Sequence, residues 1–174
     1  MAGVEPVLIA GSWREASYTE VFEPENPTTK AKTGETYPIS EIKDVEEAVE
    51  AASLASEQIA DIGNEIIALF LERLGERIEA RADEICNLAS DESGLPISPR
   101  LKDVELPRTT SQLRQAADAV RSRSWTQPTI DSATGIRSKF GPLAGGVAVF
   151  GPNNFPLAFN SIGGGDFAAS IAAG

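Results

Sequence analysis

Two residues of this sequence are candidates for a role in chemistry: the lone cysteine, Cys86, as a nucleophile, and a loop asparagine, Asn154, as a hydrogen-bond donor. A cysteine attacks as its thiolate, which a neighbouring base such as histidine generates, and the sequence contains no histidine. Cys86 also falls in the middle of an expected helix beside the apolar Ile85, and free cysteines are among the most often buried residues. We therefore expect Cys86 to be structural. Asn154, taken alone, fits an ordinary turn, where asparagine is common.

A run of glycines, Gly163–Gly165, has the composition of a phosphate-binding loop. It lacks the strand-to-helix placement of the G-x-G-x-x-G fingerprint, and no lysine follows it as in a P-loop. Glycine also allows two segments of backbone to approach closely. We therefore expect close helix packing at this run in place of phosphate binding.

Composition excludes several classes of protein. The 174 residues carry a formal charge of −11, which repels phosphate backbones and anionic lipids, so we expect neither nucleic-acid nor membrane partners. With one cysteine and no histidine, the sequence offers no disulfide, zinc site, Ser-His-Asp triad or Cys-His dyad. The N-terminus shows no leader pattern, and no apolar stretch approaches the roughly 18 residues of a membrane span. We expect a cytoplasmic protein that holds no metal.

The first third of the chain has the pattern of two short strands and a helix. Val7–Ala10 and Tyr18–Phe22 are expected as the strands, joined by a turn region. Asp44, with Glu47 three residues later, forms a capping-box pattern that opens the helix, and Gly63 ends it. Four apolar residues at helical spacing are expected on its buried face: Val45, Val49, Ala52 and Ile59.

Two further helices are expected in the middle of the chain. The first covers about Asn64–Ala89, with Gly94 and Pro96 as its stop signal. Its apolar stripe consists of Ile67, Leu71, Leu74, Ile78, Ile85 and Leu88. The second runs from about Pro107 to Arg121, because proline fits the first turn of a helix. Its buried stripe consists of Leu113, Ala117 and Val120.

The last third has the pattern of an extended segment followed by a strand, a turn and a helix. Val147–Phe150 is a continuous apolar run bounded by glycines, as in a buried parallel strand. Leu157–Ala173 is expected as a helix of small residues that the glycine run interrupts. A parallel sheet needs a second strand after such a helix, so the chain is expected to hold an incomplete sheet.

These segments, in this order, resemble the N-terminal portion of the aldehyde dehydrogenase superfamily. The resemblance is carried by Gly141–Gly174, which has Asn154-Phe155-Pro156 at its centre, by Glu105–Arg114, and by Ile9–Trp13 followed by Asn26-Pro27. It covers essentially the whole chain, which makes it far more specific than any single motif.

Within the superfamily, Phe150–Phe159 and Gly164-Gly165-Asp166 are most similar to 2-oxoglutarate semialdehyde (2,5-dioxovalerate) dehydrogenases and their NADP-using relatives. Many other branches have a tryptophan where this chain has Asn153. The resemblance therefore implies oxidation of an aldehyde, in particular a semialdehyde, to a carboxylate with NADP or NAD.

The resemblance also implies a fold of the α/β class and a division of the chain. Residues 1–125 would be the N-terminal helical part of the cofactor-binding domain. Residues 126–145 would be an extended arm by which family members reach a neighbouring subunit, the alternative being an ordinary surface hairpin. Residues 146–174 would be the first strand-turn-helix unit of a Rossmann-like sheet, left incomplete.

In the family, an asparagine amide stabilises the oxyanion of the adduct between a cysteine and the aldehyde, and Asn154 matches it. A fixed neutral amide can stabilise developing negative charge without losing a proton of its own. Phe150, Gly151, Pro152 and Asn153 match positions where the main chain lies against the cofactor, although they could simply end a strand.

The family's nucleophilic cysteine, its glutamate base and its cofactor-binding lysine would all fall after Gly174. We therefore expect the 174 residues alone to be inactive. The alternative from another class is a non-catalytic remnant that acts as a helical interaction or oligomerisation module.

Overall fold

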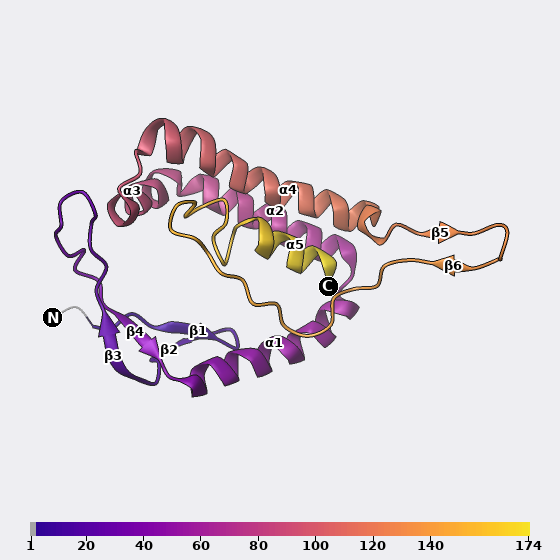
Figure 1. Cartoon of the computed structure of the whole chain (residues 1–174), viewed down its shortest axis with the longest axis horizontal. Helices are drawn as coiled ribbons and strands as arrows, with labels where there is room; N and C mark the ends of the chain where they lie inside the picture. Colours follow the sequence, from indigo (N-terminus) through magenta and orange to yellow (C-terminus); the bar gives the residue numbers. More distant parts are fainter. Residues whose placement is uncertain (1–2) are drawn as a thin grey trace.

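Two antiparallel hairpins begin the protein in the computed structural model, which describes residues 3–174 (Figure 1). β1 (Val7–Ile9) pairs with β2 (Ser12–Arg14), and β3 (Tyr18–Phe22) pairs with β4 (Tyr37–Ser40). The β1–β2 turn, Ala10-Gly11, has positive φ at both residues, the geometry that suits a two-residue hairpin. The sequence predicted β1 and β3 but did not indicate β2 and β4, because a three-residue strand and one containing proline lack the alternation that marks a strand.

Helices form the body of the protein after these hairpins. They are α1 (Ile42–Ile62), α2 (Asn64–Ala80), α3 (Ala82–Ser93), the helical segment η1 (Ile97–Glu105) and α4 (Leu106–Ser122). Gly63, with φ of +87°, separates α1 from α2, and Gly94, with φ of +70°, ends α3, so both predicted stop signals are confirmed. Pro107 lies in the first turn of α4, as predicted. Within residues 3–174, no helix has the length and apolar character that crossing a bilayer requires.

The single helix expected over residues 64–89 is wrong, because the chain breaks between α2 and α3. Arg81 leaves the helical conformation, with φ of −113° and ψ of 23°. No glycine or proline marks this position. The break turns α3 toward η1, where Cys86 and Ala89 pack against Leu101. Tertiary packing therefore sets the boundary, which helical periodicity alone does not show.

The core lies where α2 and α4 pack against each other and against α5 (Gly165–Ala173). Its buried members are Ala68, Leu71, Leu113, Ala117, Val120 and Ala168. The predicted stripe of α4 is thus confirmed. Of the stripe expected over residues 67–88, Leu71 is fully buried and Leu88 is 44% exposed. Arg114 and Arg121 add ion pairs from α4 to glutamates of α2.

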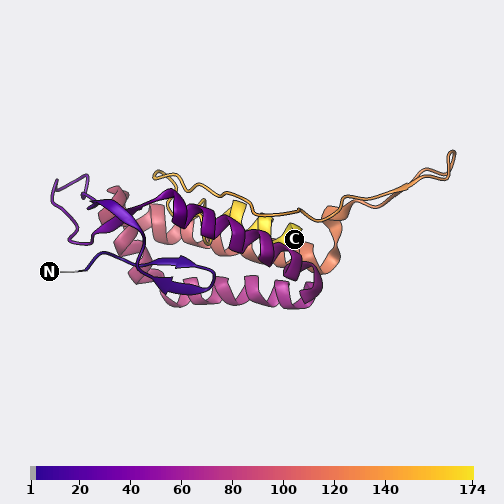
Figure 2. The same ribbon diagram turned by 90° about the horizontal axis from the view of Figure 1, so that it is seen from below.

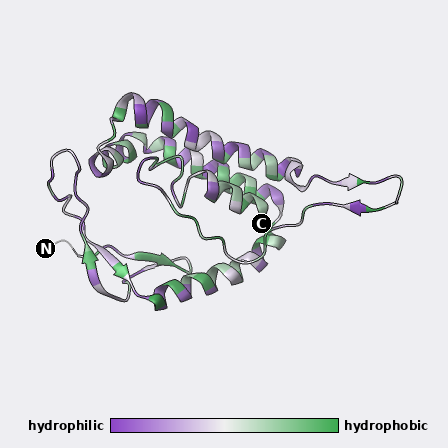
Figure 3. Ribbon diagram, in the orientation of Figure 1, coloured by the Kyte–Doolittle hydropathy of each residue, from purple (hydrophilic) through white to green (hydrophobic). Residues whose placement is uncertain are grey.

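Most of the apolar stripe of α1 is exposed, contrary to the prediction, and only Ile59 of its four predicted members is partly buried. Val45 is 49% and Val49 is 61% exposed. Figure 3 shows hydrophobic residues along α1, and the helix lies apart from the layer of α2, α4 and α5. Ile9 of β1 and the segment near Gly146 approach this face, and a Cβ added to Gly146 would lie 3.1 Å from the Cβ of Ala52. Periodicity identified the apolar face but could not show what covers it.

Asp44 does not cap α1, which begins two residues earlier after Glu41. Its carboxylate is buried and accepts hydrogen bonds from Arg14 Nη2 at 2.8 Å and from the Ser17 amide at 2.7 Å. Arg14 also pairs with Glu47, the second residue of the expected capping box. A guanidinium is a stronger partner than a helix amide, so Asp44 joins the hairpins to α1. Burial opposes ionisation, but the bonds from Arg14 and Ser17 hold the pKa of Asp44 below its ordinary value.

An extended hairpin projects from the helical body. β5 (Thr129–Ile130) pairs with β6 (Arg137–Ser138), and residues 127–144 are all exposed. Figures 1 and 2 show this hairpin reaching away from the helices in both views. Its position agrees with an extended arm, while its contacts with another subunit remain a prediction.

The strand expected at Val147–Phe150 is not formed. The segment has no strand assignment and pairs with no other strand of residues 3–174. A strand exists only when its amide and carbonyl groups are bonded to a neighbouring strand, and none of the described strands lies beside it. An apolar run can therefore have the composition of a strand and still remain irregular.

The helix expected over Leu157–Ala173 is shorter than predicted, because residues 157–164 form turns and α5 begins at Gly165. Gly164 lies so close to the preceding turn that an added Cβ would be 2.5 Å from the Asn160 amide nitrogen. A Cβ on Gly165 would lie 2.9 Å from Gln112 Nε2 of α4. The prediction that the glycine run serves close packing is confirmed.

We expect Asp44→Asn to weaken the attachment of the hairpins to α1 and to reduce the pH dependence of stability. Because the pKa of Asp44 is lowered in the folded protein, its ionised form stabilises the fold above about pH 4. This stabilisation is lost as the pH falls through the lowered pKa. Thermal unfolding of the wild type and of Asp44→Asn between pH 2 and pH 7 measures the difference.

Glu46→Gln is the matched control, because it removes the same charge from an exposed side chain of α1 for which residues 3–174 provide no ion pair. An equal loss of pH dependence in both variants would contradict the role of Asp44.

Candidate functional site

A buried glutamate holds the turn that carries Asn154. Glu105 is the last residue of η1, and its side chain is fully buried. Its Oε1 accepts hydrogen bonds from the amides of Leu157 at 2.8 Å and Ala158 at 3.0 Å. These amides follow Asn154-Phe155-Pro156 directly, so one carboxylate oxygen fixes the C-terminal end of the turn.

Arg100, also on η1, fixes the other end of the same turn. Its Nη1 forms an ion pair with Glu105 Oε2, and its Nη2 donates to the carbonyl oxygen of Asn154 at 3.0 Å. The guanidinium carbon lies 4.5 Å from the centre of the Phe155 ring, within the range of a cation–π contact. The turn is therefore held by an ion pair and by an aromatic contact.

Aromatic side chains form a surface beside Asn154. The rings of Phe155 and Phe159 meet edge to face, with centroids 5.4 Å apart and an angle of 87° between their planes. The guanidinium of Arg108, from the first turn of α4, lies 5.1 Å from the Phe159 centroid. Both phenylalanines are half-buried, so the turn presents an apolar surface with two cationic groups on it.

Asn154 is exposed at this turn, with its main chain fixed and its side-chain amide available. Within residues 3–174, that amide has no hydrogen-bond partner, while the Asn154 carbonyl is bonded to Arg100. Donation of a hydrogen bond to an oxyanion requires a main chain fixed in position and a side-chain N–H that is not already bonded, and Asn154 has both. This geometry agrees with the oxyanion role predicted for Asn154, which stays a prediction.

The residues expected at the cofactor lie just before this turn. Phe150 is 85% exposed, and Gly151, Pro152 and Asn153 line a cavity of about 390 Å³ together with Leu157 and Ser161. A Cβ on Gly151 would lie 3.3 Å from both the Phe159 carbonyl oxygen and the Ser161 amide nitrogen, so the main chain is packed closely there.

Most of the other lining residues of this cavity are apolar, among them Ile85 and Leu88, and among the described residues Glu92 is the one charged residue in the lining. Burial and the nearby charges of Glu35 and Asp91 raise the pKa of Glu92. An acidic side chain in the lining disfavours a phosphate in this cavity. Contact of Phe150–Asn153 with a cofactor stays a prediction.

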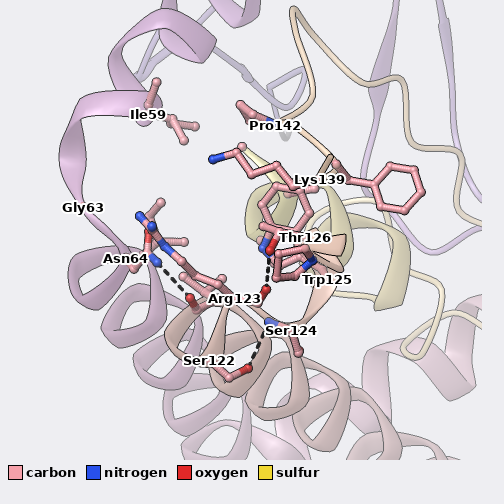
Figure 4. A pocket seen from close by; sticks show the side chains of 18 residues that line it. Ile59, Gly63, Asn64, Ser122, Arg123, Ser124, Trp125, Thr126, Lys139 and Pro142 are labelled. Atoms are coloured by element: carbon pink, nitrogen blue, oxygen red, sulfur yellow. Dashed lines mark hydrogen bonds between the residues drawn. The ribbon is translucent and has the colours of Figure 1, made fainter. Parts of the chain in front are cut away.

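A larger cavity, of about 520 Å³, lies elsewhere, at the base of the hairpin arm (Figure 4). Asn64, Trp125 and Lys139 are among its lining residues, and the amide of Asn64 donates to the Val120 carbonyl at 3.0 Å. None of Phe150–Asn154 contributes to it. The structure therefore separates this cavity from the expected site residues.

Cys86 is fully buried on α3, packed in a core with Leu101 and Leu157, and burial raises the pKa of its thiol. The prediction that it is a core residue is confirmed. Leu157 belongs to this core and also donates its amide to Glu105, so the core packs directly against the end of the turn.

The sequence analysis assigned no role to Glu105 or Arg100, although Glu105 belongs to the segment that carries the family resemblance. A signal was present, because Glu105 and Thr109 continue the spacing of the buried residues Leu113 and Ala117 along α4. An acidic residue at a buried helical position must have partners.

The family model described as the aldehyde dehydrogenase family matches residues 13–174. The chain is 34% identical to the alpha-ketoglutaric semialdehyde dehydrogenase of Acinetobacter baylyi over 169 residues, which cover 92% of this chain and 32% of that protein. It is 41% identical to alpha-ketoglutaric semialdehyde dehydrogenase 2 of Azospirillum brasilense over 118 residues, which cover 62% of this chain and 21% of that protein. The chain thus spans about a third or less of the length of these relatives.

Among solved structures, aldehyde dehydrogenase C of Pseudomonas syringae, in complex with NAD+ and octanal, has the same fold over this region. The TM-score is 0.81 at 24% identity, and the match covers 98% of this chain and 33% of that chain. The expected fold class, a partial N-terminal domain of the aldehyde dehydrogenase fold with helices and short strands, is confirmed.

We expect Cys86 to react with a chromogenic disulfide reagent only after unfolding, because its thiol is buried and its pKa is raised. Cys86→Ala should destabilise the fold by about 1 kcal/mol and leave any aldehyde oxidation within a few-fold of wild type. The labelling rate in native buffer, compared with that in denaturant, tests this. Rapid labelling of the folded protein would contradict it.

Proposed function

This chain belongs to the aldehyde dehydrogenase family, and we propose that it supplies the oxyanion donor and part of the cofactor site for oxidation of a semialdehyde to a carboxylate. The enzymes of this family use NAD or NADP. The observation that carries the proposal is the turn at Asn154, which Glu105 and Arg100 hold at both ends.

In the proposed reaction, a nucleophile adds to the aldehyde carbon, and the carbonyl oxygen becomes an oxyanion. The Asn154 amide donates a hydrogen bond to that oxygen, and it retains its proton throughout. Phe155 and Phe159 keep water from one side of the reacting carbon. The main chain at Gly151–Asn153 would hold the cofactor, whose nicotinamide would supply the acceptor for the hydride that leaves that carbon. Water would then cleave the resulting bond between the acyl group and the nucleophile, which releases the carboxylate and returns the nucleophile.

The proposal of a semialdehyde rests on two supports. The curated relatives in Acinetobacter and Azospirillum are named for alpha-ketoglutaric semialdehyde, which carries a carboxylate as well as an aldehyde. In addition, Arg108 lies beside Phe159 with no ion-pair partner within residues 3–174. A guanidinium at the turn, in a chain of net charge −11, favours an anionic substrate there.

We also propose that residues 126–145 contact a second subunit. The hairpin projects from the body, and its apolar residues Ile130, Ile136 and Phe140 are 72%, 62% and 63% exposed. Side chains of this kind are stabilised when a partner removes them from water.

Replacing Ile130 and Ile136 together by serine should lower the proportion of oligomer at a given concentration, because it removes apolar area from the proposed contact. Sedimentation velocity measures this, and Ser138→Ala on β6 is the matched control, since it leaves the apolar side chains in place. An unchanged oligomer in the double variant would exclude the arm as a subunit contact.

We expect the 174 residues alone to form no NAD(P)H from short semialdehydes, because the buried Cys86 is their only cysteine. Activity should appear when a segment with the family's nucleophile and base is present, in one chain or by complementation. In that enzyme, Asn154→Ala should lower kcat by about 10²–10³-fold, or about 3–4 kcal/mol, as for other lost oxyanion donors.

Asn153→Ala is the contrasting variant, because Asn153 is proposed to contact the cofactor and should affect the KM for NAD(P) more than kcat. Turnover by the 174 residues alone would refute the expected inactivity. Unchanged turnover in Asn154→Ala would refute the role of that residue, and inactivity under every condition would favour a non-catalytic helical module.

A further inference from the structure

We propose that the ion pair between Arg100 and Glu105 is a positioning device for the oxyanion donor, so that both residues act on catalysis through Asn154. This inference rests on the proposed function, because it assigns the ion pair a role in the same reaction. Neither side chain is assigned to the reacting atoms, so both are positioning residues.

The contacts of the pair converge on one short turn. Glu105 bonds the amides of Leu157 and Ala158, three and four residues after Asn154, and Arg100 bonds the Asn154 carbonyl itself. The Phe155 ring between these points lies under the Arg100 guanidinium. The backbone that sets the direction of the Asn154 side chain is therefore constrained on both sides.

Each member of the pair makes contacts that one hydrogen bond from another side chain could not supply. Glu105 is fully buried, and a buried carboxylate is stable only when its oxygens are bonded and its charge is compensated. One oxygen takes two amides, and the other takes Arg100. If Arg100 is lost, the carboxylate loses its counter-charge and the Asn154 carbonyl loses its donor, so the turn, including the Leu157 and Ala158 amides, opens more readily.

The charge balance also suits an oxyanion. A lone carboxylate beneath the turn would oppose negative charge that develops above it, because Coulomb interactions are strong in a site of low dielectric. Arg100 neutralises Glu105 while leaving its hydrogen bonds to the turn in place. The pair therefore constrains the turn without adding net charge near the developing oxyanion.

The ion pairs that Arg121 of α4 forms have a structural role only and serve for comparison. Arg121 reaches Glu65 and Glu72 at 2.9 Å and 2.5 Å, and it joins α4 to α2 without touching the turn. Its side chain is 31% exposed, close to the 27% of Arg100. Unlike Arg121, both Arg100 and Glu105 form hydrogen bonds to the main chain of residues 154–158. Arg121→Gln is therefore a matched control for Arg100→Gln.

The test is a double-mutant cycle in the aldehyde-oxidising protein, with Arg100→Gln and Glu105→Gln made in the wild type and in Asn154→Ala. Misplacing a catalytic group slightly costs up to about 100-fold, so we expect Arg100→Gln to lower kcat by about 10-fold with little change in KM. In the Asn154→Ala background, the same substitution should have no further effect on kcat. Arg100→Lys, which keeps the charge but lacks the planar fork, should restore only part of the rate.

The outcomes separate this inference from the proposed function. If Asn154→Ala leaves kcat unchanged, the oxyanion role fails, and the positioning role fails with it. If Asn154→Ala lowers kcat but Arg100→Gln lowers it equally in both backgrounds, the proposed function stands and the positioning role is overturned. A loss of kcat in Arg121→Gln equal to that in Arg100→Gln, at equal thermal stability, also overturns it.

Hydrogen exchange in the 174-residue chain gives a second readout that needs no activity. We expect Arg100→Gln to speed exchange at the Leu157 and Ala158 amides by about 10-fold or more while the amides of α2 and α4 remain as slow as in wild type, because local opening exposes only the released segment. Unchanged exchange at both amides would overturn the inference. Because Arg100 is partly exposed, this variant can be measured even if Glu105→Gln fails to fold.

Discussion

A carboxylate inside a protein needs hydrogen-bond donors and a counter-charge, and Glu105 finds the first in Leu157 and Ala158 and the second in Arg100. These partners come from segments about fifty residues apart in the sequence. Because the buried Glu105 carboxylate must be bonded to donors from the turn, η1 and the Asn154 turn lie together in the fold. Cys86, Leu101 and Leu157 pack beneath the same contact, so part of the apolar core serves to keep water from it.

The protein has a well-packed helical core and, apart from it, apolar surfaces that are exposed to solvent. α2, α4 and α5 bury their stripes against one another, and ion pairs from Arg114 and Arg121 reinforce the contact between α2 and α4. The apolar face of α1 and the hairpin arm, in contrast, are exposed to solvent within residues 3–174. Exposed apolar surface of this extent is characteristic of regions that make contacts with other protein segments.

Charge is distributed unevenly around the proposed site. The chain has a net charge of −11, yet two guanidinium groups lie on the aromatic surface beside Asn154. Arg100 is committed to Glu105 and to the turn, whereas Arg108 has no such partner among the described residues. The two arginines therefore differ: Arg100 compensates a buried acid, and Arg108 is the one that we propose offers positive charge to an anionic substrate.

Local patterns in the sequence determined much of this protein. The positive-φ glycines at 63 and 94 end helices as predicted, the stripe of α4 is buried, and the glycine run at 163–165 packs closely. The order of motifs identified the family and placed Asn154 in its turn. Each of these predictions depends on a pattern that can be seen within a few residues or in the order of motifs along the chain.

Tertiary structure decided the rest. The helix expected over residues 64–89 breaks at Arg81, and Val147–Phe150 pairs with no described strand. Asp44 accepts a hydrogen bond from Arg14 and does not cap α1. The tertiary structure also showed that Glu105 and Arg100 hold the turn. The sequence could not show these features, because the pairing of a strand or of a buried charge depends on which distant groups reach it in the folded chain.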